Sequence, residues 1–160
     1  MGKEIERKFL VNAGEWETLD KPHPKLYRQG YFVTNPGKSI RIRFSDKNSY
    51  LTIKSEPANL SRSEFEYKIP DTDALELLDH FCDAELEKHR YIIFHQNKRW
   101  EVDVFLNDNE GLIMAEIELE EADETFDLPS WIEKEVTRNE KYYNASLVTN
   151  PFKKWPSSYH

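Results

Sequence analysis

The chain has 160 residues, of which 38% are hydrophobic and 32% are charged, and its formal net charge is −8 at pH 7. This length fits one domain over residues 1–160, and nine Phe, eight Tyr and four Trp argue against disorder. The acidic balance argues against binding of nucleic acid or of an anionic membrane, and no apolar run is long enough to span a bilayer. The single cysteine, Cys82, excludes an internal disulfide and favours a reducing, cytoplasmic location.

Apolar and charged residues alternate along eight segments, a pattern typical of β-strands with one apolar and one charged face. In chain order these segments are residues 3–11, 26–33, 39–44, 51–54, 62–69, 88–91, 100–104 and 115–120. Residues with turn chemistry separate several of them, including Asn35-Pro36-Gly37, Gln96-Asn97-Lys98 and the stretch 107–111. Because such short connections favour antiparallel neighbours, the sequence predicts an antiparallel sheet.

One helix is predicted between the fifth and the sixth of these segments. Asp73 and Glu76 have the spacing of a capping box, and the apolar stripe of a helix accompanies them: Ala74, Leu75, Leu78, Phe81 and Cys82. A cysteine on such a stripe is typical of a small core residue rather than of a nucleophile. After residue 123 the pattern is mixed, and we expect short helical turns at 130–135 and 144–148.

The sign of the charged residues on the charged face differs from strand to strand. For any one strand, a face exposed to water explains the alternation. Across the chain, however, the third, fourth and sixth segments are cationic, the seventh and eighth are acidic, and the first and fifth are mixed. The cations are Lys8, Arg41, Arg43, Lys54, Arg62, Lys88 and Arg90, and the acids are Glu4, Glu6, Glu64, Glu66, Glu101, Asp103, Glu116 and Glu118. Eight antiparallel strands suffice to close a barrel. We therefore predict a mainly β (α+β) fold: an eight-stranded, closed antiparallel β-barrel with a charged lumen and a few short helices outside.

Such a lumen suits a triphosphate together with divalent metal ions. Arginine offers forked donors that match phosphate oxygens, and lysine offers a compact point charge. Carboxylates at alternate strand positions, as in Glu4 and Glu6 or Glu116 and Glu118, suit hard cations such as Mg²⁺ or Mn²⁺. Hydrolysis of a phosphoanhydride requires that its charge is neutralised, its terminal phosphoryl group is positioned and a water is activated. The charged face offers these functions, but no Ser/His/Asp or Cys/His nucleophile set.

The segment Glu4-Ile5-Glu6-Arg7-Lys8 matches the ExExK signature of the CYTH superfamily, also called the triphosphate tunnel metalloenzymes. Further motifs agree in order, among them Gln29-Gly30-Tyr31, Ile40-Arg41-Ile42-Arg43, Glu101-Val102-Asp103-Val104-Phe105 and Lys141-Tyr142-Tyr143-Asn144. The resemblance extends over about residues 2–148. Within the superfamily, the chain most resembles the short bacterial members that hydrolyse inorganic tripolyphosphate.

The resemblance implies a role for each matching residue. Divalent metal would be bound by Glu4, Glu6, Glu116 and Glu118, with Asp103 assisting. Phosphates would be held by Lys8, Arg41, Arg43, Lys54, Lys88 and Arg90, and Lys141 would help to cover the substrate. Arg62, Glu64 and Glu66 match further inward, substrate-facing positions, and Lys88 and Tyr31 would form a catalytic pair near the scissile phosphate. The implied protein is a Mg²⁺- or Mn²⁺-dependent hydrolase of tripolyphosphate, with nucleoside triphosphates as further substrates.

Two other functions use the same lumen and remain open: a class IV-type adenylate cyclase, and a non-catalytic protein that binds polyphosphate or nucleotides. The opposite face of the strands is apolar and carries Ile5, Phe9, Ile40, Ile42, Phe44, Phe65, Trp100, Ile117 and Leu119. One helix and a tail cannot cover so many apolar side chains. We therefore expect part of this face to pack against a second subunit, as in a homodimer.

Overall fold

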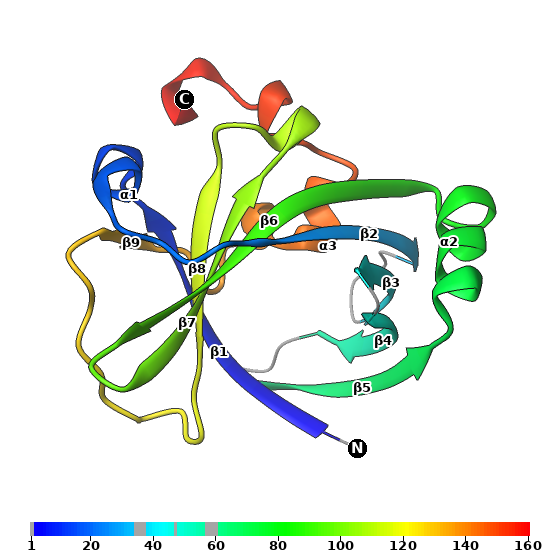
Figure 1. Ribbon diagram of the computed structural model, residues 1–160, viewed down its shortest axis with the longest axis horizontal. Coiled ribbons are helices and arrows are strands. Elements are labelled where there is room, and N and C mark those ends of the chain that lie inside the picture. Colours follow the sequence, from blue (N-terminus) through cyan, green and yellow to red (C-terminus); the bar gives the residue numbers. More distant parts are fainter. Residues whose placement is uncertain (1, 34–37, 47, 57–60) are drawn as a thin grey trace.

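The structure is a computed structural model, and it describes residues 2–33, 38–46, 48–56 and 61–160. Within these ranges nine strands join in one sheet, in the order β5-β4-β3-β2-β6-β7-β8-β1-β9, and β5 also pairs with β1. Strands β1 to β8 therefore close into an antiparallel barrel (Figure 1). The strands are β1 (Gly2–Val11), β2 (Lys25–Val33), β3 (Lys38–Ser45), β4 (Asn48–Ser55), β5 (Ser61–Ile69), β6 (Ala84–His95), β7 (Lys98–Phe105), β8 (Ile113–Glu118) and β9 (Ile132–Glu135).

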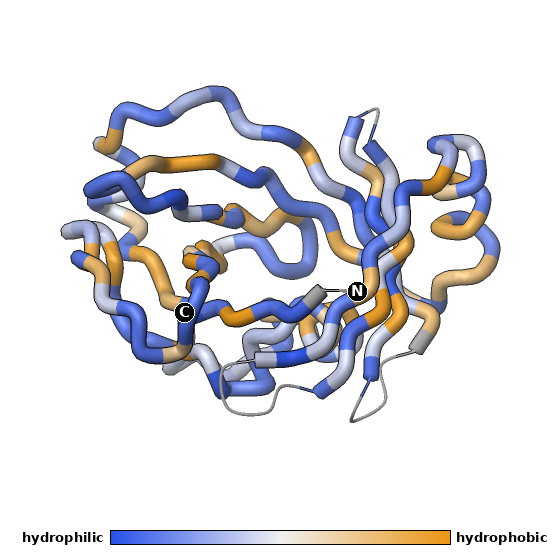
Figure 2. The backbone as a smooth tube through the Cα atoms, turned by 90° about the horizontal axis from the view of Figure 1, so that it is seen from below, coloured by the Kyte–Doolittle hydropathy of each residue, from blue (hydrophilic) through white to orange (hydrophobic). Residues whose placement is uncertain are grey.

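The barrel confirms the predicted fold, since each of the eight alternating segments coincides with one of its strands, and only the last segment extends two residues beyond its strand, β8. Polar and apolar residues, blue and orange, follow one another along these strands in Figure 2. The ninth strand, β9, corrects the helical turn predicted at 130–135. Strand β5 pairs with β1 only at residues 2–5, so that the edge of β1 near Phe9 and Val11 is left for β9. An unpaired strand edge leaves N–H and C=O groups unsatisfied, which favours a strand at this position over a helical turn.

The predicted hairpin turns are formed wherever the structure describes them. Gln96 and Asn97 join β6 to β7 with φ angles of 49° and 61°, the left-handed conformation that a two-residue hairpin turn requires. Asn107 and Gly111, with φ angles of 55° and 98°, shape the connection from β7 to β8, which contains the 3₁₀ turn η1 (Asn107–Asn109). The turn predicted at Asn35-Pro36-Gly37 lies outside the described residues.

Helix α2 (Asp71–His80) confirms the helix predicted after the fifth strand, and it packs against β3 and β4 on the outside of the barrel (Figure 1). The predicted capping box is wrong, because the helix begins directly after Pro70 and Asp73 already lies in its first turn. Asp71 and Asp73 instead place negative charge near the positive end of the helix dipole. Phe81, from the predicted apolar stripe, follows the last turn and is 61% exposed.

The C-terminal segment contains α3 (Asn144–Leu147), which confirms the helical turn predicted at 144–148. Three 3₁₀ turns accompany it, η2 (Glu140–Tyr142), η3 (Phe152–Lys154) and η4 (Ser157–Tyr159). The sequence did not predict α1 (Ala13–Thr18), whose N-cap residue Asn12 accepts a hydrogen bond from the Glu15 amide at 2.9 Å. Six residues are too few to show a helical apolar period. None of the helices within the described ranges has the length and apolar character needed to cross a membrane.

Cys82 has the packing role predicted for it. It lies against Gly30 of β2, where an added Cβ atom would come within 2.8 Å of the Cys82 sulfur, so that only glycine fits. Burial, with Glu85 and Asp83 nearby, raises the pKa of the Cys82 thiol to about 11. The thiol is therefore protonated at neutral pH, as suits a residue that joins the end of α2 to the barrel.

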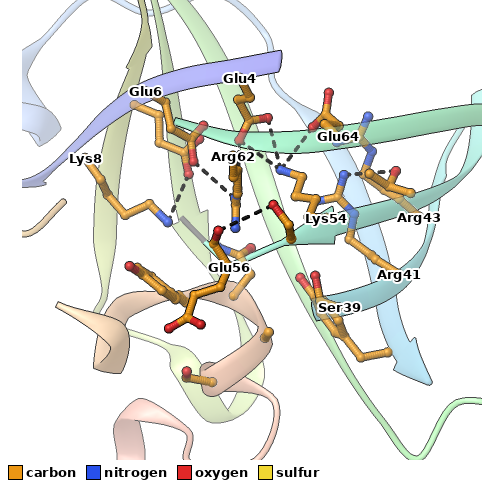
Figure 3. A pocket seen from close by; sticks show the side chains of 18 of the residues that line it. Glu4, Glu6, Lys8, Ser39, Arg41, Arg43, Lys54, Glu56, Arg62 and Glu64 are labelled. Carbon is orange, nitrogen blue, oxygen red and sulfur yellow. Dashed lines mark hydrogen bonds and ion pairs between the residues drawn. The ribbon is translucent and has the colours of Figure 1, made fainter. Parts of the chain in front are cut away.

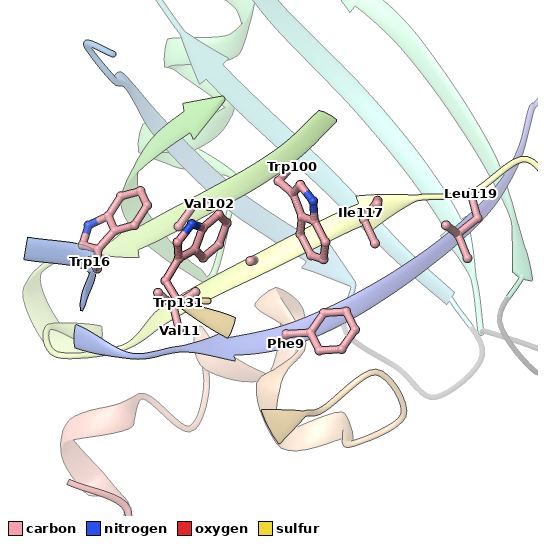
Figure 4. Close-up of a cluster of buried hydrophobic side chains, with 9 residues drawn as sticks. Phe9, Val11, Trp16, Trp100, Val102, Ile117, Leu119 and Trp131 are labelled. Atoms are coloured by element: carbon pink, nitrogen blue, oxygen red, sulfur yellow. The ribbon is translucent and has the colours of Figure 1, made fainter. Parts of the chain in front are cut away.

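An aromatic cluster covers the outer face of β1, β7 and β8 (Figure 4). The ring centroid of Trp131 lies 6.0 Å from those of Trp100 and Trp16, and that of Phe126 lies 5.8 Å from Trp100. The buried members of the cluster are Phe9, Val11, Trp16, Trp100, Val102, Ala115, Ile117, Leu119 and Trp131. The chain itself buries this part of the apolar face, so the second subunit that we expect would have to pack against another part of it. Helix α1 and the chain between β8 and β9 fold back over the cluster. Neither segment has a periodic sequence pattern from which this packing could be predicted.

At one end of the barrel, the inward positions of the strands change from charged to apolar. These apolar residues are Leu86, Phe105 and Met114, each two positions from Lys88, Asp103 and Glu116 respectively and thus on the same face. They form a buried cluster with Tyr142, Leu147, Phe152 and Trp155 of the C-terminal segment. This segment therefore closes that end of the lumen with apolar contacts.

Candidate active site

The inward side chains of the barrel line a cavity of about 380 Å³ (Figure 3). Every predicted site residue lines this cavity except Asp103 and Lys141. The strand register explains the convergence, because residues opposite each other on paired strands project to the same face. Lys8 lies opposite Glu116, Lys54 opposite Glu64, and Glu4 opposite Arg62. The remaining lining residues include Tyr143 and Asn144 from the C-terminal segment.

Around β1, the cations of the lumen are paired with carboxylates. Lys54 Nζ lies 3.1 Å from Glu4 Oε2 and 3.2 Å from Glu64 Oε2. Arg62 contacts Glu4 at 3.2 Å and Glu6 at 3.4 Å, and Lys8 Nζ lies 3.4 Å from a Glu116 oxygen. These pairs compensate the charges buried in the lumen, because each charge there has an opposite charge within reach.

The carboxylates of this region differ strongly in pKa. Burial, together with the neighbouring Glu116 and Glu4, raises the pKa of Glu6 to about 8. Burial also acts to raise the pKa of Glu4 and Glu116, but the cations beside them, chiefly Lys54 for Glu4 and Lys8 for Glu116, hold both pKa values well below the usual range. Three carboxylates therefore crowd one region, and one of them takes up a proton to relieve the repulsion.

Asp103 lies behind the cavity wall, between Lys88 and Arg90. Its side chain is 2% exposed and accepts hydrogen bonds from Arg90 Nε at 2.7 Å and Arg90 Nη2 at 2.9 Å. Lys88 Nζ contacts the Asp103 carboxylate at 2.9 Å. Burial lowers the pKa of Lys88 to about 7 in spite of this contact, and Arg90 acts in the same direction. The position of Asp103 is that of a counterion for two cavity-facing cations.

Sequence reasoning assigned no role to Gln29 and Asn144, which connect the predicted catalytic pair. Lys88 Nζ donates to Asn144 Oδ1 at 2.8 Å, and Gln29 Nε2 donates to the same oxygen at 3.0 Å and to Tyr31 Oη at 3.1 Å. Gln29 is fully buried. A neutral amide gives no charge signal in an alternating pattern. The one available indication was that both residues stand in the motifs that carry the family resemblance.

Arg41 and Arg43 of β3 differ from the other lumen cations. Their guanidinium groups lie 3.8 Å from the Glu66 carboxylate, beyond hydrogen-bonding distance. Arg41 Nη2 donates to Thr52 Oγ1 at 3.3 Å, but among the described residues the buried Nε atom of either arginine has no hydrogen-bond partner. Unsatisfied buried donors of this kind are costly unless a ligand accepts from them. Donors of this kind on two neighbouring arginines are chemically suited to an anion.

Lys141, which the resemblance placed over the substrate, lies outside the cavity. Its Nζ atom lies 4.5 Å from the ring centroid of Trp155 and 4.0 Å from that of Tyr159. Its neighbours Glu140 and Tyr143 do line the cavity. The aromatic tail thus holds the lysine on the side of the C-terminal segment that faces away from the lumen.

The donors needed for a divalent cation are present on one side of the cavity. Glu4, Glu6, Glu116 and Glu118 all line it, and carboxylate oxygen is the ligand that Mg²⁺ and Mn²⁺ prefer. In the described part of the chain, no three acidic, histidine or cysteine side chains are already gathered as a metal site. The crowding that raises the pKa of Glu6 nevertheless fits a cation, since a positive ion among these carboxylates replaces the proton.

The chain matches the CYTH domain family over residues 2–150. An inorganic triphosphatase of Acetivibrio thermocellus is 45% identical over 154 residues, which are 96% of this chain and 97% of that protein. The crystal structure of the inorganic triphosphatase NE1496 has a TM-score of 0.64 at 32% identity, and the match covers 92% of this chain and 95% of the other. A candidate adenylate cyclase of Bacillus halodurans shares the fold, with a TM-score of 0.60 at 21% identity over 76% of this chain and 84% of its own.

These matches agree with the resemblance inferred from the alternating motifs, and they extend over nearly the whole sequence. The barrel with a charged lumen and the family match lead to the same result. The chain belongs to the CYTH domain family.

Proposed function

We propose that the chain is a divalent-metal-dependent triphosphatase that hydrolyses the terminal phosphoanhydride of inorganic tripolyphosphate inside the barrel. The observation that carries this proposal is the division of the lumen: on β3, two arginines whose buried Nε donors have no partner among the described residues face the same cavity as the carboxylates of β1 and β8. The first group accepts an anion and the second a metal cation. The 45% identical relative from Acetivibrio thermocellus, an inorganic triphosphatase, supports the choice of substrate.

In this proposal, Arg41 and Arg43 bind phosphate oxygens through guanidinium donors that have no partner within the described chain. Lys8, Lys54 and Arg62 exchange part of their contact with carboxylates for contact with the substrate. Mg²⁺ or Mn²⁺, bound by Glu4, Glu6, Glu116 and Glu118, would neutralise phosphate charge and activate a water. Glu64, Glu66 and Arg90 line the same cavity and orient these binding groups.

Lys88 and Tyr31 are proposed as the catalytic pair. Lys88 Nζ contacts Asp103 at 2.9 Å and Asn144 at 2.8 Å, and the residue lines the cavity. With a pKa of about 7, Nζ can hold or release a proton near neutral pH. A proton at that atom stabilises the charge that develops on the leaving phosphate oxygen. Asp103 serves here to orient Lys88, and Lys141 is proposed to approach the substrate only after it leaves its contacts with Trp155 and Tyr159.

The test is a matrix of substrates and metals with product identification. Tripolyphosphate, ATP and thiamine triphosphate are incubated with Mg²⁺, with Mn²⁺ or with EDTA. We expect metal-dependent release of orthophosphate, fastest from tripolyphosphate. Cyclic AMP and pyrophosphate from ATP would establish the cyclase alternative, and tight anion binding without turnover would establish the non-catalytic alternative.

We further propose that residues 1–160 form one cytoplasmic domain that pairs as a homodimer. The C-terminal segment supports a single domain because Phe152 and Trp155 belong to a cluster with barrel residues. An apolar surface remains on the outer face of β4 and β5, where Ile53 is 37% and Tyr67 is 56% exposed. Light scattering at micromolar concentration tests the dimer. A monomeric mass would contradict it.

A further inference from the structure

The ring of Tyr27 lies between two guanidinium groups of the lumen. The Cζ atoms of Arg43 and Arg90 are each 5.0 Å from the centroid of this ring. The arrangement follows from the order of the strands, since β2 lies between β3, which carries Arg43, and β6, which carries Arg90. Both distances are within the range in which an aromatic ring attracts a cation.

Arg43 depends on such contacts more than the other lumen cations do. Its ion-pair partner Glu66 lies 3.8 Å away, whereas Arg90 donates to Asp103 at 2.7 Å. A second ring, that of Tyr50, lies 5.6 Å from Arg43 Cζ. An aromatic ring can hold a guanidinium group in place without neutralising its charge or using its N–H donors. A carboxylate would do both, and would compete with a phosphate for the same donors.

Tyr27 lies beside the two arginines and is not among the residues that line the charged cavity. Arg43 lines the charged cavity, and Tyr27 lines a second cavity of about 600 Å³ beside it, while Arg90 lines both. The Tyr27 ring thus lies near two groups that line the charged cavity without lining that cavity itself. A residue so placed acts on binding only through its neighbours.

We propose that Tyr27 is a positioning residue for phosphate binding: its ring holds Arg43 and Arg90 in the orientation in which their donors face the charged cavity. The inference rests on the proposed function, because the anion that these arginines bind is the triphosphate. It adds a residue that the charge pattern of the strands does not reveal, since tyrosine is neutral.

The experiment compares Tyr27→Leu, which removes the ring, with Tyr27→Phe, which keeps it. Tyr67→Leu is the matched control, because Tyr67 lies on the outside of β5 and is 56% exposed. Affinity for tripolyphosphate is measured by calorimetry in EDTA, and KM and kcat are measured with Mg²⁺. We expect Tyr27→Leu to weaken binding and to raise KM about tenfold, with a much smaller change in kcat. Tyr27→Phe and Tyr67→Leu retain binding within about twofold.

A wild-type Kd and KM for Tyr27→Leu would overturn the inference. An equal loss of affinity in Tyr27→Phe would overturn it too, because the effect would then belong to the hydroxyl group.

Thermal unfolding shows whether Tyr27→Leu is folded. If it is not, Tyr27→Met and Tyr50→Leu take its place, and we expect the larger loss from Tyr27→Met because Tyr50 contacts Arg43 alone of these two arginines. If wild-type protein neither binds nor hydrolyses tripolyphosphate, the proposed function fails first. If wild-type protein does both and the ring variants match it, only the inference about Tyr27 fails.

Discussion

The lumen has two regions that treat positive charge differently. Near β1, Lys54 and Arg62 contact Glu4 at 3.1 and 3.2 Å, so the protein balances their charge itself. On β3, Arg41 and Arg43 lie 3.8 Å from their acid, and the second is held by aromatic rings. A buried cation can remain available to a ligand if the protein restrains it without a close ion pair. The carboxylate-rich region suits metal, and the arginine region suits phosphate.

The largest effect on activity is expected from a substitution in the carboxylate-rich region near β1. Glu116→Gln keeps the size of the side chain but removes the charge that faces Lys8 at 3.4 Å. We expect a fall in tripolyphosphate hydrolysis of about a hundredfold, because a proposed metal ligand is lost. Initial rates over a range of Mg²⁺ concentrations measure it. Glu121→Gln, at an exposed position after β8, serves as the control. A wild-type rate in Glu116→Gln at every metal concentration would count against the metal assignment.

The next effect concerns Asn144, which connects Lys88 of β6 to Gln29 of β2. Asn144→Ala removes the oxygen that accepts from both Lys88 and Gln29, at 2.8 and 3.0 Å. We expect kcat to fall about ten- to a hundredfold, since Lys88 loses a group that orients it. Asn150→Ala tests an exposed asparagine of the same segment and should leave kcat unchanged. Equal kcat values for the two variants would show that Asn144 does not position Lys88.

The substitution Arg41→Ala tests the arginine region of β3. This change removes a cation whose Nε atom has no partner within the described residues. We expect KM for tripolyphosphate to rise about ten- to a hundredfold, the range of a lost hydrogen bond to a charged group, with a smaller change in kcat. Arg28→Ala is the control, because Arg28 pairs with Asp79 and Glu85. If both variants raise KM equally, the effect belongs to general charge and not to the cavity.

The smallest effect is expected from an ion pair at the surface. Arg7 Nη2 lies 2.6 Å from Glu135 Oε1, and both side chains are about a third exposed. The hydrogen bond from Arg7 lowers the pKa of Glu135 below its ordinary 4.5. The stabilisation is thus present above that pH and is lost as the pH falls through the lowered pKa. Glu135→Gln should cost at most about 1 kcal/mol at pH 7 and leave the activity unchanged. Thermal unfolding from pH 7 downward tests this, and a difference between wild type and variant that does not shrink as the pH falls would contradict it.

Much of the fold follows from local patterns. Residues 39–44 and 100–104 alternate so regularly that their strands, and the face each turns inward, can be predicted from sequence. Residues 13–18 and 130–135 could not be predicted. The first segment is too short to show a helical period, and the second becomes a strand only because β1 extends beyond β5.

The sequence by itself determined which residue types face the lumen, because a period of two in charge requires no knowledge of neighbouring strands. It determined the family as well, since the motifs stand in order along the chain. Only the tertiary structure decided which cations have a close acid partner and which have a distant one, because pairing depends on distances between strands far apart in sequence. It alone placed Asn144 against Lys88, Tyr27 between two arginines, and Lys141 on the aromatic tail. Neutral and aromatic side chains carry no charge pattern, and their roles follow from where closure of the barrel places them.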